Sequence, residues 1–129
     1  MTAPAKKTVM VVDDAALVRL FYRDCLERAG YEVHEAINGL EALEKLLLKE
    51  PDLLIVDVNM PQMDGFTFLA ALRNRELPLA SIPALITSTE SGAQDVAAAE
   101  KAGANFYLVK PVDQETLIEY AALLCGLSP

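Results

Sequence analysis

The sequence predicts an α/β domain built on a doubly wound, five-stranded parallel sheet with five helices. Five short apolar runs alternate along the chain with five segments whose apolar residues recur at helical spacing. Strands that alternate with helices indicate right-handed crossovers, a parallel sheet, and helices on both faces of it. The length of 129 residues is close to that of one compact domain of roughly 100–150 residues. We therefore expect residues 1–129 to form a single domain.

The first strand and helix are predicted from the apolar pattern after residue 7. Thr8–Val12 is a β-branched apolar run, typical of a strand buried on both faces, and it stops at Asp13 and Asp14. Gly30 is expected to close the helix that follows, because glycine commonly ends helices. The inward stripe of this helix is Val18, Phe21, Tyr22, Cys25 and Leu26.

The second strand is expected over Tyr31–Ile37, and a capping signal follows it. Asn38 has the side chain of an N-cap, and Glu41 stands three residues later, as in a capping box. Pro51 marks the end of the helix, because the residue before a proline disfavours helical backbone. The apolar residues of this helix are Leu40, Leu43, Leu46 and Leu47.

The same alternation continues through the middle of the chain. Asp52–Asp57 is predicted as the third strand, and Met63–Arg75 as a helix with Phe66, Leu69 and Leu72 inward. Pro83–Ser88 is predicted as the fourth strand. Ser91 and Gln94 form a second capping box, which opens an alanine-rich helix that Gly103 stops.

The last strand and helix complete the pattern. Phe106–Val109 is predicted as the fifth strand, and Asp113 as the cap of a final helix. The apolar positions of that helix are Leu117, Ile118, Ala121 and Leu124. No linker, repeat or low-complexity tract interrupts the sequence, and no output domain is expected within it.

The charge of the chain excludes some classes of partner. Nineteen acidic against eleven basic residues give a formal net charge of -8, which repels nucleic-acid phosphates and anionic membranes. No apolar run has membrane-spanning length, and residues 1–7 lack the pattern of a signal peptide. Cys25 and Cys125 lack metal-ligand spacing and are interpreted as small hydrophobes in a reducing compartment, with a disulfide left open. We expect a cytoplasmic protein with no direct nucleic-acid or membrane partner.

Polar residues follow or end four of the five predicted strands. Asp13 and Asp14 follow the first, Asp57 ends the third, Thr87 lies at the end of the fourth, and Lys110 follows the fifth. Ligands of an open parallel sheet bind outside the carboxyl ends of its strands. Each of these residues, taken alone, can be explained as a helix cap, a turn residue or a surface residue with no function. Together, the acids, the hydroxyl and the lysine indicate a functional site.

The acids predict a metal site and a phosphoryl acceptor. Three neighbouring carboxylates repel one another unless a cation lies between them, and oxygen ligands in a compact site favour Mg²⁺. One carboxylate can then attack a phosphoryl donor, giving an acyl phosphate, while the metal and Lys110 neutralise the transferred charge. Asp57 is the expected nucleophile, because it ends the most apolar strand and the other acids flank it.

Four motifs make the chain resemble a response-regulator receiver domain of two-component signalling, over about residues 9–124. The resemblance implies the flavodoxin-like, CheY-like strand order 2-1-3-4-5. Ala15, Ala16 and Val112 depart from the commonest pattern at positions that are not catalytic. The motifs are Val11-Val12-Asp13-Asp14, Asp57-Val58-Asn59-Met60-Pro61 with Met63-Asp64-Gly65, Ile86-Thr87-Ser88, and Gly103-Ala104-Asn105 with Tyr107-Leu108-Val109-Lys110-Pro111.

The resemblance implies roles for the acids. A histidine kinase or a histidine phosphotransfer protein would phosphorylate Asp57. Mg²⁺ would be held by Asp14, Asp57 and the backbone carbonyl of Asn59, and Asp13 would act through a metal-bound water. Asn59 and Thr89 occupy the two positions that tune the lifetime of the phosphoryl group.

The resemblance also implies a switch. Lys110 and Ser88 would contact the phosphoryl group, and the Thr87 hydroxyl would move toward it. Tyr107 would then turn inward and change the surface, although an ordinary half-buried strand tyrosine is the alternative. The bond between Lys110 and Pro111 is expected to be cis.

Three apolar residues are candidates for contact with partner proteins. Phe106 either adds to a partner or dimer surface on the last strand or packs under the neighbouring helix. Leu17 and Leu20 are either docking contacts for the phosphodonor or edges of the helical stripe. His34, the only histidine, is interpreted as a solvent-facing strand residue and not as a phosphohistidine relay.

The leading hypothesis is a stand-alone phosphorylation switch that binds a downstream target protein, as a monomer or weak dimer, in chemotaxis or in a phosphorelay. It is not expected to be an enzyme beyond its own phosphorylation and dephosphorylation. An aspartyl-phosphate hydrolase is one alternative, but it would need a general acid where Asn59 stands. A flavodoxin-like cofactor carrier would have a phosphate loop where two aspartates stand. A binding-only pseudo-receiver would have lost a catalytic residue.

Overall fold

The computed structural model describes residues 6–126, and its five strands form one parallel sheet in the order β2-β1-β3-β4-β5. This order confirms the predicted doubly wound sheet, in which the direction of winding reverses between β1 and β3. The amino-terminal residues considered for a signal peptide lie mostly outside the described residues, as do residues 127–129. The strands are β1 (Thr8–Val12), β2 (Glu32–Ala36), β3 (Leu53–Asp57), β4 (Ala84–Ser88) and β5 (Phe106–Val109).

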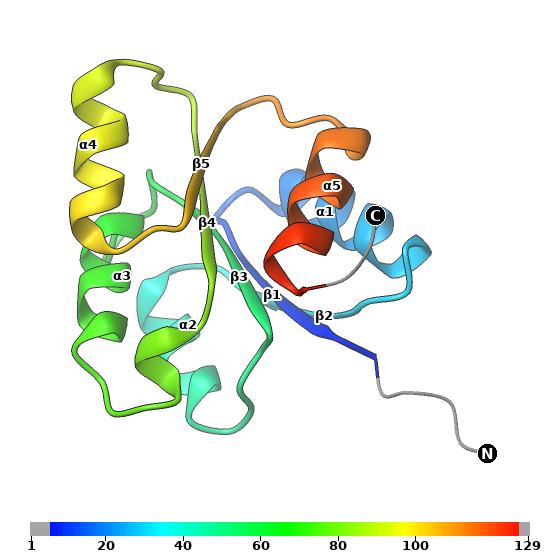
Figure 1. The fold of residues 1–129 in the computed structure, drawn as a ribbon, viewed down its shortest axis with the longest axis horizontal. Coiled ribbons are helices and arrows are strands. Elements are labelled where there is room, and N and C mark those ends of the chain that lie inside the picture. The colour runs from blue at the N-terminus through cyan, green and yellow to red at the C-terminus, as the bar shows by residue number, and fades with distance from the viewer. Residues whose placement is uncertain (1–5, 127–129) are drawn as a thin grey trace.

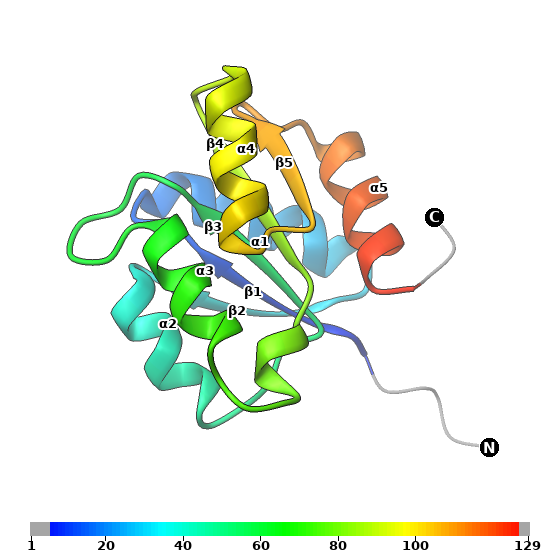
Figure 2. The same cartoon turned by 60° about the vertical axis from the view of Figure 1, so that its left-hand side comes forward.

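Helices cover both faces of the sheet (Figures 1 and 2). Helices α1 and α5 pack together on one face, while α2, α3 and α4 form the layer on the other. Within residues 6–126, no helix is long and apolar enough to cross a membrane. The helices are α1 (Ala16–Arg28), α2 (Gly39–Leu46), α3 (Gly65–Arg73), α4 (Ala93–Ala102) and α5 (Gln114–Leu124), with a short 3₁₀ turn, η1 (Leu79–Ser81), before β4.

The sheet separates two hydrophobic cores. Successive side chains of a strand point to opposite faces, so Val9 and Val11 enter the core under α1 and α5, whereas Met10 and Val12 enter the core under α2, α3 and α4. Every residue of β1, β3 and β4 is buried. This burial on both faces explains why these strands appear in the sequence as continuous apolar runs.

Several helix ends match the predicted caps. The Asn38 side-chain oxygen accepts a hydrogen bond from the Glu41 amide at 2.9 Å, and the Asp113 carboxylate accepts one from the Thr116 amide at 2.7 Å. Asp64 caps α3, so this helix begins at Gly65 and not at the predicted Met63.

Other helix boundaries differ from the prediction. Helix α4 begins after Gly92, which has no side-chain cap, so the predicted capping box of Ser91 and Gln94 does not form. Asp95 lies in the first turn, where the positive end of the helix dipole stabilises its negative charge. Helix α2 ends at Leu46, well before Pro51, and α3 ends at Arg73 and not at Arg75.

Arg73 joins the carboxyl end of α3 to two other segments, the turn before β4 and the loop between α4 and β5. Its guanidinium donates to the carbonyl of Gly103 at 2.9 Å and to those of Ala80 and Ile82 at 3.0 and 2.7 Å. A fourth hydrogen bond, of 3.3 Å, reaches the side chain of Asn105, which also accepts from the amide that begins β4. Arg73 forms no salt bridge with an acid of residues 6–126, and burial lowers its pKa. Arg73 is therefore a structural clamp: its guanidinium joins these segments by donating hydrogen bonds to their oxygens.

Replacing Arg73 with methionine is expected to lower the free energy of unfolding by about 3 kcal/mol, because three part-buried carbonyls lose their charged donor. Urea unfolding measures the change. Arg75→Met is the matched control, since Arg75 is exposed and such surface changes stay within about 0.5 kcal/mol. Equal stability of the two variants would show that the clamp contributes nothing.

Candidate functional site

The carboxyl ends of the strands bring the five predicted site residues together. Asp57 ends β3 and lies in register with Thr87 of β4. Asp13 directly follows β1, and its amide donates to the carbonyl of Ala36 in β2 at 3.1 Å. Lys110 directly follows β5, and its amide donates to the Ser88 carbonyl at 2.7 Å. The backbone of the sheet therefore fixes the position of each of these residues.

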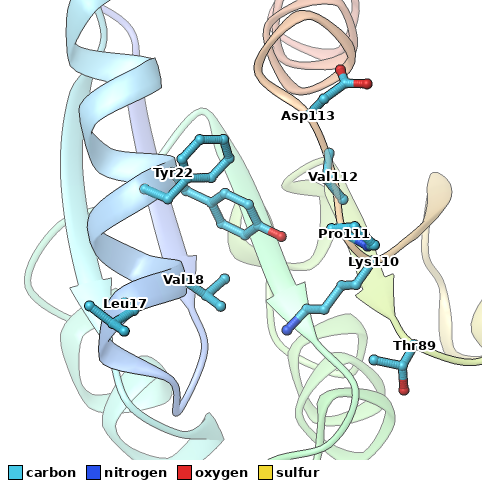
Figure 3. Close-up of a pocket in the computed structure, with 9 residues that line it drawn as sticks. Leu17, Val18, Tyr22, Thr89, Lys110, Pro111, Val112 and Asp113 are labelled. Carbon is cyan, nitrogen blue, oxygen red and sulfur yellow. The ribbon is translucent and has the colours of Figure 1, made fainter.

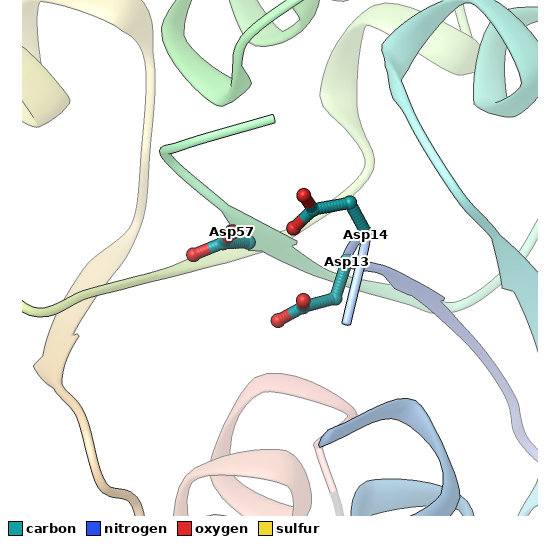
Figure 4. Close-up of side chains that lie close together, drawn as sticks. All are labelled: Asp13, Asp14 and Asp57. Carbon is teal, nitrogen blue, oxygen red and sulfur yellow. The ribbon is translucent and has the colours of Figure 1, made fainter. Parts of the chain in front are cut away.

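Three carboxylates form the acidic part of the site (Figure 4). Asp13, Asp14 and Asp57 each offer an oxygen, and these oxygens lie within 4.8 Å of one another. Asp13 and Asp57 are buried, with 1% and 5% of their surface exposed, whereas Asp14 is exposed. Mutual repulsion at this separation favours a bound cation.

Lys110 supplies the positive charge nearest to the buried acids. Its ammonium lies 2.8 Å from Asp13 Oδ2 and 3.0 Å from Asp57 Oδ1, and 16% of its side chain is exposed. Burial lowers the pKa of Lys110, but its hydrogen bonds to Asp13 and Asp57 outweigh this effect and raise it. The lysine is therefore a charged part of the site and not a surface residue.

Burial determines the acidity of Asp57. The pKa of this carboxyl is raised, first by burial and further by Asp13 and Asp14, while the hydrogen bond from Lys110 opposes the shift. A carboxylate that is poorly solvated and only partly neutralised is more reactive toward an electrophile than one in water.

Both oxygens of the Asp13 carboxylate already have partners. Oδ2 faces Lys110, and Oδ1 accepts a hydrogen bond from the Ala15 amide at 2.9 Å. The backbone carbonyl of Asp13 accepts from Arg19 at 2.7 Å, and Arg19 in turn pairs with Glu35 of β2 at 2.9 Å. The loop that carries the first two acids is therefore tied to α1 and β2.

Gly65 leaves the room that the loop after β3 requires. A Cβ atom on Gly65 would overlap the backbone carbonyl of Asp57 and press on Val58. The Gly65 amide donates to the Val58 carbonyl at 2.9 Å, which closes the loop around the exposed Asn59. This close approach is a physical reason for glycine in the Met63-Asp64-Gly65 motif.

The hydroxyl residues occupy distinct positions around the acids. Thr87 is fully buried, and its hydroxyl makes no hydrogen bond with the described residues. Ser88 is buried beside it, and its hydroxyl accepts from the Glu90 amide at 3.1 Å. Thr89 is exposed.

Tyr107 is half-buried, and its hydroxyl donates to the Glu90 carbonyl at 2.6 Å. The peptide bond between Lys110 and Pro111 is cis, as expected.

The structure also places the candidate partner residues. Leu17 and Leu20 are 80% and 60% exposed, so they lie outside the helical stripe. Phe106 is 38% exposed and packs edge to face against Tyr120 of α5, with ring centroids 5.1 Å apart. Phe106 therefore combines the two predicted alternatives. His34 lies half-buried on the edge strand β2, in register with Met10 of β1 and not at the strand end that carries the acids.

The sequence pattern placed Tyr22 in the core but missed the cavity that its side chain lines. A cavity of about 700 Å³ lies between α1 and the loop after β5, and Lys110 and Val112 line its far side. Phe21, predicted as part of the inward stripe, lines this cavity and is 42% exposed. Tyr22 is buried as predicted, but its hydroxyl points toward Lys110 (Figure 3). A tyrosine with a polar tip in an apolar stripe was the only available signal.

Known proteins share this arrangement. The chain is 38% identical over 120 residues to the chemotaxis protein CheY1 of Helicobacter pylori, a match that covers 92% of this chain and 96% of that protein. It is 43% identical over 105 residues to a protein-glutamate methylesterase/protein-glutamine glutaminase of Archaeoglobus fulgidus. That match covers 80% of this chain but 29% of the relative, so the chain spans less than a third of that protein.

A solved structure agrees with these sequence matches. The chemotaxis protein CheY4 of Vibrio cholerae has a TM-score of 0.87 and 36% identity, covering 93% of this chain and 99% of that one. The family of response regulator receiver domains matches residues 9–122. With its strand order, its strand-end acids and these matches, the chain belongs to the response regulator receiver domain family.

Proposed function

We propose that the protein is a receiver that accepts a phosphoryl group on Asp57 and thereby changes its binding to another protein. The observation that carries this proposal is the contact of one ammonium, that of Lys110, with both buried acids. A structural lysine would need only one partner, whereas a phosphoryl group placed on Asp57 would find a cation already beside it.

The residues present fit a Mg²⁺ ion, since three carboxylate oxygens lie within 4.8 Å of one another. We assign Asp14, Asp57 and the Asn59 carbonyl as its ligands. Both oxygens of Asp13 are already engaged, which supports a contact of Asp13 through water. When bound, the ion would neutralise charge on the phosphoryl oxygens and the acids.

The chain's own residues would handle the phosphoryl group. Asp57 supplies the attacking oxygen, and Lys110 keeps that carboxylate ionised and pairs with a phosphoryl oxygen after transfer. Thr87 supplies a buried hydroxyl that has no hydrogen-bond partner among residues 6–126, which suits a new hydrogen bond to the phosphoryl group. Ser88 lies next to Thr87 and leaves space for the group, and Asn59 and Thr89 flank the site as the lifetime-tuning positions.

The switch would run from Thr87 to Tyr107. Tyr107 is tied to the loop after β4 through the Glu90 carbonyl, and the same loop carries the Ser88 hydroxyl bond. Movement of Thr87 toward a phosphoryl group would therefore shift the loop and the tyrosine together. The surface of β5, with Phe106, is where a downstream target would register the change.

The phosphodonor would be a histidine kinase or a histidine phosphotransfer protein. Leu17 and Leu20 are exposed on α1, and Leu17 lines the same cavity as Lys110, which supports docking there. The match to a protein named for chemotaxis, which covers 92% of this chain and 96% of that protein, supports a role in chemotaxis or a related phosphorelay. We further propose that the protein acts in the cytoplasm as a monomer or weak dimer. No general acid stands at Asn59, which disfavours the hydrolase alternative, and no acid of the site is missing, which disfavours a pseudo-receiver.

Incubation with acetyl phosphate and Mg²⁺ is expected to add one phosphoryl group per chain. Intact-protein mass spectrometry measures the addition. Borohydride reduction of the acyl phosphate, followed by peptide mapping, is expected to locate it at Asp57. Chelation of Mg²⁺ should remove most of the signal. No addition in the presence of Mg²⁺, or a label mapped to another residue, would contradict the proposal.

A further inference from the structure

The Lys110 ammonium has one hydrogen-bond donor left for a third partner. An ammonium carries three N–H groups. Two of them are directed at Asp13 and Asp57, at 2.8 and 3.0 Å. The side chain of Lys110 also faces the cavity lined by Tyr22, and Figure 3 shows the Tyr22 hydroxyl and the ammonium pointing into the same space.

The Tyr22 hydroxyl belongs to the site and not to the apolar core around its ring. Tyr22 is 2% exposed and its ring packs in the core beneath α1 and α5. Burial raises the pKa of Tyr22, so its hydroxyl stays protonated. Lys110 and Thr87 oppose this rise in pKa, whereas Asp13 and Asp57 add to it. All four groups that influence this pKa belong to the site, so the hydroxyl faces the site.

Thr87 is the natural acceptor for the Tyr22 proton. Its hydroxyl is fully buried and has no hydrogen-bond partner in the described part of the chain. A threonine hydroxyl has one proton to donate and two lone pairs to accept with. If a neighbouring donor occupies a lone pair, the threonine's own proton is left free to point at a phosphoryl oxygen.

We propose that Tyr22 is a positioning residue that bridges Lys110 and Thr87. Its oxygen accepts the third N–H of Lys110, and its O–H donates to Thr87 Oγ1 as the threonine turns toward the phosphoryl group. One phenol thereby aligns the two side chains that hold the phosphoryl oxygens. This inference rests on the proposed phosphorylation of Asp57.

Tyr22→Phe tests the bridge, because it removes one oxygen and keeps the ring. We expect it to weaken binding of beryllofluoride, a phosphoryl mimic, by about fivefold in the presence of Mg²⁺, the loss of about one hydrogen bond. Fluorine NMR titration measures the affinity. Tyr31→Phe is the matched control, since Tyr31 is a buried tyrosine of the same core, and it should leave the affinity unchanged.

A double-mutant cycle separates positioning from a structural effect. In a Thr87→Val background, Tyr22→Phe should change beryllofluoride affinity by less than about twofold, because the hydroxyl that it orients is gone. The same fivefold loss in both backgrounds, or no loss in either, would overturn the bridge while leaving the proposed function intact. Failure of the wild-type chain to bind beryllofluoride would overturn both.

Discussion

Asp57→Asn is expected to abolish phosphoryl uptake and to raise the thermal stability of the metal-free protein. The amide has nearly the same volume as the carboxylate, but it is not a nucleophile toward phosphorus. Stability rises because Asp57 is buried beside two other acids, and burial is the main cause of its raised pKa. A carboxyl whose pKa is raised by folding is less stable as an anion in the fold than in the unfolded chain.

The pH dependence of this gain follows from the direction of the shift. The unfolded chain loses the Asp57 proton near the ordinary carboxyl pKa of about 4, and the folded chain loses it at a higher pH. The cost of the charge is therefore complete above the folded pKa and disappears as the pH falls toward about 4. The stability difference between the variant and the wild type should be largest at neutral pH and shrink on acidification.

Mass spectrometry after treatment with acetyl phosphate measures uptake, and thermal unfolding in a chelator between pH 5 and 8 measures stability. Asp24→Asn, at an exposed position of α1, makes the same chemical change away from the site. It should keep full labelling and a melting temperature close to that of the wild type. Equal labelling of the Asp57 variant, or a lower melting temperature at pH 7, would refute the expectation.

Lys110→Met is expected to destabilise the fold by about 3 kcal/mol at neutral pH, because removing one partner of a buried ion pair leaves uncompensated charge. Here the substitution leaves two buried carboxylates, Asp13 and Asp57, without their cation. Added Mg²⁺ should recover part of the loss by supplying positive charge to the same acids. Phosphoryl uptake should be slowed, because the transferred group loses its counter-charge.

The contribution of Lys110 to the free energy of unfolding should be constant across neutral pH. Burial lowers its pKa, but the bonds to Asp13 and Asp57 prevail and raise it. Its stabilisation is thus fully present below the unfolded pKa of about 10.4 and is lost as the pH rises through the higher folded value. Urea unfolding at pH 7 and 9 should show a similar deficit at both. Lys101→Met, an exposed change on α4, is the control, and an equally small effect at Lys110 would exclude a buried ion cluster.

The elements that the sequence predicted best are those whose patterns have a single physical cause. β1, β3 and β4 appear as unbroken apolar runs because they are buried on both faces. The strand-end acids and Lys110 could be grouped because parallel strands end at one edge. The starts of α3 and α4 were placed less well, since several neighbouring residues can cap a helix and packing selects among them.

Tertiary contacts account for what the sequence did not show. Arg73 looks like any basic residue at the end of a helix, and its hydrogen-bond partners lie up to 32 positions away. Tyr22 fits the apolar stripe of α1, and only the fold shows that its hydroxyl points toward Lys110 across a shared cavity. Long side chains with polar ends are ambiguous in a periodic pattern, because their two ends have different surroundings.

The division of the interior into two cores has a consequence for how this protein tolerates change. Side chains under α1 and α5 do not touch those under α2, α3 and α4, because the backbone of the sheet lies between them. Substitutions in separate cores share no partners, so their energetic costs should add. The face with α1 would meet a phosphodonor, and most of the surface that would meet a target lies on the other face. These two faces can therefore change in sequence independently, while the acids at the sheet edge must stay fixed.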